Sequence, residues 1–325
     1  MSLLPQDNAA LDAISQIVGK LLPQLSHIQG AKAGFCVEGD RLIALSLRGC
    51  ELTSLPDALW HLTDLQTLIL GENPLAVLSD RIGELTRLKQ LYIYNTELTA
   101  LPDSLGQLSA LRILDLGHNK LTSIPETLGN LRELAVLYLH DNKFNALPEA
   151  LFAHLDKLTY LNVGENWLSA LPESIGQSIN LRELRADQAN LSRLPESLGN
   201  LAQLRELHLR SNWLDQLPEL LGKLVDLRRL YLQKSWVTAL PESIGNLNQL
   251  TELDLRDNRL MALPASIGEL SRLVYLDLRA NPLTTLPESI ANLPKLEKLD
   301  LRWTQIAAIP AWFERLDARG CLIYL

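Results

Sequence analysis

One short leucine pattern recurs along this chain at nearly constant spacing, and such a period constrains the fold more than any other feature of a sequence. The segment 250–270 reads L-T-E-L-D-L-R-D-N-R-L-M-A-L-P-A-S-I-G-E-L, and similar lines begin 23 residues before and after it. The pattern begins twelve times, at Leu42, Leu65, Leu88, Leu111, Leu134, Leu158, Leu181, Leu204, Leu227, Leu250, Leu273 and Leu296. Each unit has 23 residues, except that the fifth has one more. A chain of 325 residues ordinarily suggests two or three domains, but a solenoid grows by adding units to one stack.

The first half of each unit predicts a short strand followed by a bend. Leu253 and Leu255 alternate with polar residues, as in a strand with one buried face. Asn258 follows where the chain must turn, and its side chain can bond the open backbone groups of the bend and of the next coil. Seven units carry this asparagine: Asn73, Asn119, Asn142, Asn166, Asn212, Asn258 and Asn281. Small polar residues replace it at Cys50, Thr96, Ser235 and Thr304, whereas Ala189 has no group that could bond.

The second half of each unit predicts a short helical segment. Eleven of the twelve units carry a proline such as Pro264, which suits the first turn of a helix, and Ser79 is the exception. An acidic residue usually follows the proline and favours a helix N-terminus. A glycine such as Gly268 comes one turn later and is expected to let the helix end. Stacked coils of this kind predict an α/β solenoid with one parallel sheet on the inside of a curve.

This pattern resembles the leucine-rich repeat family. The 23-residue spacing with L-P-x-x-I/L-G-x-L is similar to the class found in plant intracellular Ras-group-related, Scribble-like and bacterial intracellular repeat proteins. The resemblance covers residues 42 to 325. It implies an arc with a concave parallel sheet that binds other proteins and with short helical or 3-10 segments on the convex side. It implies no catalysis and no cofactor.

The residues outside the repeats predict caps at both ends, so that the domains are residues 1–41, 42–318 and 319–325. Apolar residues at helical spacing from Leu11 to Ile28 predict a helix that is interrupted near Pro23. Residues 33–45 predict a strand, a turn at residues 38–40 and a second strand. We interpret residues 1–41 as a cap over the first repeat. The alternative is a helix that binds a membrane surface or a partner.

The C-terminal residues 319–325 predict a partial strand at an open sheet edge, which is an aggregation hazard. Three explanations stay open. Trp303, Trp312 and Phe313 could fold over the last coil, the edge could form a homodimer with a second copy, or the natural protein could continue into a further domain.

Composition and charge exclude several classes of function. The net charge of −8 and the pI near 5.3 argue against nucleic-acid binding, which needs a basic surface. The chain has no apolar run of about 18 residues and no secretory signal, so we expect no membrane span. Three cysteines cannot pair completely, which favours a reducing compartment. We therefore predict a cytoplasmic protein or, alternatively, a translocated bacterial effector that acts in a host cell.

Charged residues recur on the strands of the last three units, at positions expected to face the concave side. The sequence Asp-Leu-Arg appears at residues 254–256, 277–279 and 300–302. Neighbouring strands lie about 4.8 Å apart, so these residues predict a row of carboxylates beside a row of guanidinium groups. One interpretation is a surface ladder that satisfies itself, in which each pair contributes about 0–1 kcal/mol. The other is a charged docking strip.

Aromatic residues predict a second feature of the concave side, in the middle units 88–256. Tyrosine, tryptophan and arginine are enriched at binding hot spots, and an exposed aromatic band is unusual on a surface without a partner. The predicted partner-binding residues are Tyr92, Tyr94, Tyr138, His140, Tyr160, Trp167, Arg185, His208, Arg210, Trp213, Tyr231, Trp236, Arg256 and Arg279. The alternative is that the tryptophan rings lie flat against neighbouring coils.

No sequence motif of a P-loop, a zinc protease or an α/β-hydrolase is present. His118, His140 and Asp141 lie in adjacent units, but we expect chance proximity and no metal site. The sequence therefore predicts a non-catalytic scaffold that binds a protein partner on its concave face. Two alternatives stay open. The chain could be the substrate-recognition module of an effector ubiquitin ligase, a kinase or a Ras-like GTPase, or it could bind a glycan or small ligand along its Tyr and Trp residues.

Overall fold

The computed structural model describes residues 3–30 and 32–325, and the chain divides into two compact units, Met1–Leu161 and Asn162–Leu325. Residues 1, 2 and 31 belong to the predicted N-terminal cap and lie outside the described residues. The boundary between the units falls within β7 (Tyr160–Asn162). The domain limits predicted from the sequence stay a prediction.

The first unit contains a helix, a hairpin and a series of coils. Its helix is α1 (Pro5–Ile17), and its strands before β7 are β1 (Ala33–Glu38), β2 (Arg41–Leu47), β3 (Thr67–Ile69), β4 (Gln90–Tyr92), β5 (Ile113–Asp115) and β6 (Val136–Tyr138). β1 and β2 pair antiparallel, and β2 to β6 pair parallel in chain order. The 3-10 helices are η1 (Asp57–His61), η2 (Asp80–Glu84), η3 (Asp103–Gln107), η4 (Glu126–Asn130) and η5 (Glu149–Phe152).

The second unit continues the same alternation. Its strands after β7 are β8 (Glu183–Arg185), β9 (Glu206–His208), β10 (Arg229–Tyr231), β11 (Glu252–Asp254), β12 (Tyr275–Asp277), β13 (Lys298–Asp300) and β14 (Leu322–Tyr324), all paired parallel in chain order. Its 3-10 helices are η6 (Glu173–Gln177), η7 (Glu196–Asn200), η8 (Glu219–Lys223), η9 (Glu242–Asn246), η10 (Ala265–Glu269) and η11 (Glu288–Asn292). A short helix α2 (Phe313–Asp317) replaces the 3-10 helix in the last coil.

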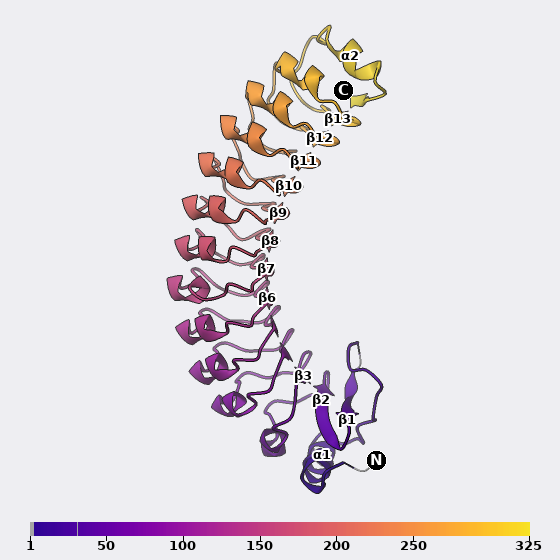
Figure 1. The fold of residues 1–325 in the computed structure, drawn as a ribbon, viewed down its shortest axis with the longest axis vertical. Helices are drawn as coiled ribbons and strands as arrows, with labels where there is room; N and C mark the ends of the chain where they lie inside the picture. The colour runs from indigo at the N-terminus through magenta and orange to yellow at the C-terminus, as the bar shows by residue number, and fades with distance from the viewer. Residues whose placement is uncertain (1–2, 31) are drawn as a thin grey trace. The chain divides into compact units, whose positions relative to one another are not determined.

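Within each unit the strands lie along one side and the 3-10 helices along the opposite side (Figure 1). The leucines of each coil point between these two sides: Leu250, Leu253, Leu255, Leu260 and Leu270 have no exposed surface. Burial of such a side chain contributes about 1.5–3 kcal/mol. The predicted fold class, an α/β solenoid with a parallel sheet and short 3-10 segments, is confirmed. Among the described residues, no helix has the length and apolar character needed to traverse a lipid bilayer.

The asparagine that recurs in the bends is explained by the bonds that Asn212 makes. Its Nδ2 donates to the carbonyl oxygens of Leu209 in its own coil and Ala186 in the preceding coil, both at 2.8 Å. Its Oδ1 accepts from the backbone N–H groups of Ala189 at 3.2 Å and Leu191 at 2.9 Å. The prediction of bonds within the bend is confirmed, but the expected direction was wrong, because the asparagine bonds the preceding coil and not the next one.

The proline of each coil lies just before the 3-10 helix and not inside its first turn. Pro218 has φ −67° and ψ 144°, and its carbonyl oxygen accepts from the N–H of Leu221 at 3.0 Å. Where serine replaces proline, the Ser79 side chain accepts from the N–H of Arg81 at 3.2 Å. The proline therefore holds the backbone extended just before the 3-10 helix begins, and it is not itself a residue of the helix.

The glycine near the end of most of the 3-10 helices serves close packing and does not end the helix through a left-handed conformation. A Cβ atom on Gly222 would lie 2.5 Å from the carbonyl oxygen of Ser243 in the next coil, and one on Gly199 would lie 2.6 Å from that of Leu220. Neither glycine has a positive φ. The expectation that the glycine lets the helix end was wrong, because the spacing of the repeats does not reveal how closely the helices of successive coils approach each other.

The N-terminal cap forms, but its helix is shorter than the sequence predicts. α1 ends at Ile17, and Gly19 follows with φ 67°, so the helical spacing that continues to Ile28 does not correspond to helix. α1 packs against η1, and the buried Asp7 accepts a hydrogen bond from the N–H of Leu42 at 3.0 Å. The predicted strand, turn and strand are confirmed as β1 and β2, with Gly39 at φ 63° in the turn.

At the C-terminal end, Phe313 and Leu316 of α2 are buried over the last coil, as the capping explanation predicts. Trp303 was predicted to join this cap, but 74% of it is exposed. Trp303 follows its strand with a positive φ of 62°, as Asp257 and Ala280 do at the same position of the two preceding coils. β14 pairs with β13, and its outer edge carries the exposed Leu322.

The bonds of the bend predict a large loss of stability on replacing Asn212 with alanine. The change removes the partners of two buried N–H groups and two carbonyls, and an unsatisfied buried group costs about 1–3 kcal/mol. We expect Asn212→Ala to lower the free energy of unfolding by about 3 kcal/mol in urea titrations followed by tryptophan fluorescence. Asn200→Ala, at an exposed position of η7, is the control and should change it by less than about 0.5 kcal/mol. Equal effects of the two changes would contradict this account.

Candidate functional site

Two predicted tyrosines of the first unit border a small pocket on the sheet face. Tyr92 comes from β4 and Tyr94 follows it, and together with Arg48 and Asp115 they line a pocket of 230 Å³. The guanidinium of Arg48 lies 5.8 Å from the centre of the Tyr94 ring. Burial raises the pKa of both tyrosines, so their hydroxyl groups stay protonated and can donate hydrogen bonds.

A second aromatic cluster of the first unit surrounds Tyr138. Its ring centre lies 4.9 Å from that of Tyr160 and 5.9 Å from that of His140. His118 bonds the carboxylate of Asp141 through Nδ1 at 2.7 Å and lies 3.2 Å from Nε2 of His140. Both ring nitrogens of His118 are engaged in this way, whereas the buried Nδ1 of His140 has no hydrogen-bond partner among the described residues. The expectation of no metal site at these residues stays a prediction.

The second unit joins three predicted residues in one cluster. The ring of Tyr231 lies 4.7 Å from that of His208, and the guanidinium of Arg210 lies 4.6 Å above Tyr231. The Tyr231 hydroxyl donates to Glu252 at 3.0 Å. Burial, together with this hydrogen bond, raises the pKa of Tyr231 to about 12. Tyr231 is therefore fixed in place with its ring half-buried.

His208 was predicted to be exposed on this face but is 4% exposed. Burial and the nearby Arg185 lower the pKa of His208 to about 4, so the imidazole is neutral near pH 7. Its Nε2 lies 3.4 Å from Glu206 and 3.9 Å from Glu183, a group of three that could hold a metal ion. Both carboxylates are already paired, Glu183 with Arg185 at 2.6 Å and Glu206 with Arg229 at 2.8 Å. Sequence reasoning missed the two glutamates, although they stand at one position of consecutive units.

The predicted carboxylate row exists, but it is buried. Asp277 and Asp300 have no exposed surface and Asp254 has 5%. Arg279 binds Asp277 at 2.6 Å and also lies 3.5 Å from Asp300, which Arg302 binds at 2.7 Å. The row was predicted to be a surface feature, and this was wrong because the arginine side chains cover the carboxylates of their own strands.

Asp254 and Asp300 differ in their electrostatic surroundings. Burial raises the pKa of Asp254 to about 6, since Arg256 approaches it only to 3.4 Å. Burial also acts to raise the pKa of Asp300, but the hydrogen bonds from Arg302 and the charge of Arg279 bring it below its ordinary value. Equivalent positions of the repeat therefore carry carboxyl groups of different acidity.

The predicted tryptophans line a groove beside the bends of the second unit, which we name the tryptophan groove. Trp167, Trp213 and Trp236 border its volume of 530 Å³ and are 59%, 49% and 41% exposed. The rings of Trp213 and Trp236 meet edge to face at 4.3 Å, and the guanidinium of Arg259 lies 3.9 Å from the Trp236 ring. Trp213 and Trp236 do pack on neighbours, yet all three tryptophans keep a large exposed area.

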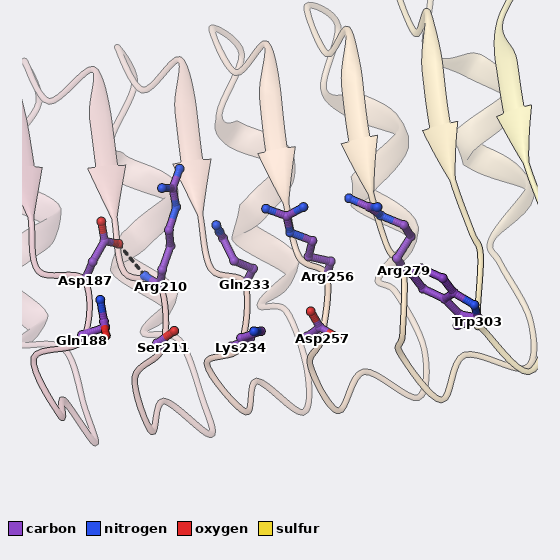
Figure 2. Close-up of a pocket in the computed structure, with 10 residues that line it drawn as sticks. All are labelled: Asp187, Gln188, Arg210, Ser211, Gln233, Lys234, Arg256, Asp257, Arg279 and Trp303. Carbon is purple, nitrogen blue, oxygen red and sulfur yellow. Dashed lines mark hydrogen bonds between the residues drawn. The ribbon is translucent and has the colours of Figure 1, made fainter.

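A second groove of 420 Å³ crosses the sheet face just beyond the strand ends, and we name it the arginine groove (Figure 2). Its lining residues are Asp187, Gln188, Arg210, Ser211, Gln233, Lys234, Arg256, Asp257, Arg279 and Trp303. The nitrogen-bearing ends of Arg210, Gln233 and Arg256 lie side by side in Figure 2, followed by Arg279. The carboxylate of Asp187 accepts from the backbone N–H of Arg210 at 2.8 Å. Sequence reasoning missed Gln233 and Lys234, because neither belongs to a row of similar side chains in consecutive units.

The structure thus groups the predicted residues into local clusters. Tyr92 with Tyr94, and Tyr138 with His140 and Tyr160, form the clusters of the first unit. In the second unit the clusters are His208 with Arg210 and Tyr231, the tryptophan groove, and the arginine groove. Most of the predicted tyrosines are half-buried and not freely exposed as expected, because side chains of adjacent coils pack against their rings.

A model of the leucine-rich repeat region matches residues 101–219 and 214–304. The chain belongs to the leucine-rich repeat family. Among solved structures it is similar to a leucine-rich repeat protein of Leptospira interrogans, with 32% identity over 85% of this chain and 82% of that one and a TM-score of 0.57. A search of curated proteins finds no significant match.

Leucine-rich repeat proteins of other kinds are also similar. A chain of the Toll–Spätzle complex of Drosophila matches with 27% identity over 82% of this chain and 37% of that one, with a TM-score of 0.72. An internalin of Listeria monocytogenes shares the fold at 18% identity over 99% and 95% of the two chains, with a TM-score of 0.67. The chain thus spans most of the bacterial proteins and well under half of the Toll-complex chain. Family membership supports a role in protein binding.

The unequal aspartates predict that two chemically identical changes differ in their dependence on pH. A carboxyl group whose pKa is raised on folding loses stabilisation as pH rises through about 6, so Asp254→Asn should become relatively more stable than wild type between pH 4.5 and 7.5, by about 1–3 kcal/mol. The pKa of Asp300 is lowered on folding, so its carboxylate stabilises the fold at every pH above the ordinary pKa of an aspartate. Asp300→Asn should therefore cost about 3 kcal/mol at both pH values, because Arg302 and Arg279 lose their partner.

Urea titrations of both variants at pH 4.5 and 7.5 measure these differences. A stability loss for Asp254→Asn that grows with pH would contradict the stated origin of its raised pKa.

Proposed function

We propose that this protein binds a protein partner through the sheet face of its coils and performs no chemistry there. The observation that carries the proposal is the cluster of Tyr231, His208 and Arg210, in which a half-buried tyrosine ring packs against an imidazole and a guanidinium. Tyrosine and arginine dominate binding hot spots because they combine large apolar area with directed hydrogen bonds. The tryptophan groove adds exposed aromatic area in the same coils.

Pre-organisation strengthens the proposal. Ordering a flexible side chain on binding costs about 0.5–1.5 kcal/mol, and this cost falls when the side chain is already held. The Tyr231 hydroxyl is bonded to Glu252 at 3.0 Å, and strand pairing on both sides fixes the backbone beneath the ring. A partner that docks on this face would therefore meet surfaces that need little rearrangement.

The fourteen predicted contact residues remain part of this proposal, and those of the first unit form its second contact region around Tyr138. The alternative role as the recognition module of an enzyme system stays a prediction from the sequence. So does the homodimer, for which the exposed Leu322 and Tyr324 of β14 offer the contact. All three cysteines are buried and unpaired, which supports a reducing compartment such as the cytoplasm.

Replacing two tyrosines of the sheet face is expected to weaken partner capture. Truncation of a hot-spot residue costs more than about 1–2 kcal/mol, so Tyr138→Ala combined with Tyr231→Ala should reduce binding at least about tenfold. The measurement is quantitative mass spectrometry of proteins retained from a lysate by the immobilised wild type and variants. Val225→Ala is the control, since Val225 is 52% exposed and lies beyond η8, away from the strands. Proteins retained equally by all three would refute this contact surface.

A further inference from the structure

The arginine groove carries more positive charge than this acidic chain leads one to expect. Its lining includes four cationic side chains, Arg210, Lys234, Arg256 and Arg279, against the two carboxylates of Asp187 and Asp257, whereas the whole chain has a net charge of −8. The groove is therefore a local site of attraction for anions.

The cations of the groove are neutralised to different degrees. Arg279 is held by Asp277 and Asp300, and its side chain is 17% exposed. Arg256 has a looser contact of 3.4 Å with Asp254, and its side chain is 38% exposed. Within residues 3–30 and 32–325, no carboxylate lies within ion-pair distance of Arg210, whose guanidinium stacks on Tyr231. Arg210 and Arg256 thus retain the capacity to bind a carboxylate in the two-bonded geometry that arginine favours.

Gln233 lies between these two arginines and provides an independent sign of a binding site. It is 7% exposed, and its Oε1 has no hydrogen-bond partner in the part of the chain described. Its nitrogen points into the groove, level with the guanidinium groups of Arg210 and Arg256 (Figure 2). A buried amide oxygen without a partner costs about 1–3 kcal/mol, and a ligand N–H group that donates to the Gln233 amide would recover part of this cost.

We propose that the arginine groove binds an extended acidic segment of the protein partner, with aspartate or glutamate carboxylates seated at Arg210 and Arg256 and with the Gln233 amide bonded to the backbone of the segment between them. This inference rests on the proposed function, because it names the chemistry of the partner that the sheet face takes.

The spacing of the donors favours acidic residues three apart. Arg210 and Arg256 are two coils apart, and two strand spacings amount to about 9.6 Å. In a polyproline II segment, residues i and i+3 lie about 9.3 Å apart and point to the same side. Such a segment can therefore run across the coils with one acidic side chain at each arginine.

A nucleic acid fits the groove less well than an acidic peptide. Asp187 and Asp257 stand within the groove, and the net charge of −8 repels a regular row of phosphates, which binds where cations predominate. A segment with separated carboxylates can place its charges at the two arginines and avoid both aspartates.

The test is fluorescence anisotropy with a labelled peptide in which glutamate stands at every third position between proline and alanine. We expect saturable binding, at least tenfold tighter than that of the same peptide with glutamine in place of glutamate. A peptide of identical composition with its glutamates adjacent should bind more weakly than the spaced one. A single-stranded RNA oligonucleotide serves as the other anion.

Variants of the groove identify the residues responsible. Arg210→Gln combined with Arg256→Gln should weaken the spaced peptide at least tenfold, and Gln233→Leu about threefold. Arg228→Gln removes one charge from an exposed arginine outside the groove and should change binding by less than twofold. Circular dichroism melting of each variant checks that the coils remain folded.

Equal binding of the glutamate and glutamine peptides would overturn the proposal, as would tighter binding of the RNA or an equal loss with Arg228→Gln. Failure of the peptide, together with partner capture that still depends on Tyr138 and Tyr231, would refute this inference and leave the proposed function intact. Peptide binding with capture independent of those tyrosines would refute the proposed contact surface instead.

Discussion

The bend after each strand would leave buried N–H and carbonyl groups without partners, and the asparagine that bonds them is the interaction on which the stack depends. Asn258 joins the carbonyl of Leu232 in the preceding coil to its own bend and accepts from the N–H groups of Ser235 and Val237. Because one side chain serves two coils, each coil is fixed in register with the one before it. Equivalent positions then line up in rows, and every surface cluster of the protein is made from such rows.

Some coils in which another residue replaces the asparagine differ in backbone conformation just after the bend. Where alanine, serine or cysteine replaces the asparagine, the following residue takes a left-handed conformation: Asn190 at φ 60°, Trp236 at 64° and Glu51 at 56°. Such a conformation is rare for a bulky residue and is maintained only when the surrounding structure enforces it. At Trp236 it presents the ring to Trp213 within the tryptophan groove. The exceptions to the repeat thus shape the surface that we propose for binding.

The sequence predicts the parts of the structure that depend on period alone. Alternating leucines predict the strands, and Leu-Pro predicts the start of each 3-10 segment. The sequence does not predict what depends on the neighbouring coil. The burial of Asp277 results from the position of Arg279 above it, and the need for Gly222 results from the closeness of Ser243. Helical spacing near Ile28 failed for a related reason, since these apolar residues pack on β1 and β2 without forming a helix.

The row at the fifth position of the units explains why the free positive charge is concentrated in one place. In the units that contain Asp254, Asp277 and Asp300, each buried carboxylate is followed two residues later by an arginine. Arg279 contacts two of these carboxylates, those of Asp277 and Asp300. The row then changes to Tyr231 and His208, which carry no negative charge, while an arginine persists at Arg210. Carboxylates therefore end before the arginines do, and Arg210 stacks on an aromatic ring where its counterparts bind an acid. The row of aspartates neutralises the row of arginines over several coils. Where the aspartates end and an arginine remains, that arginine is available to bind an anion from a partner.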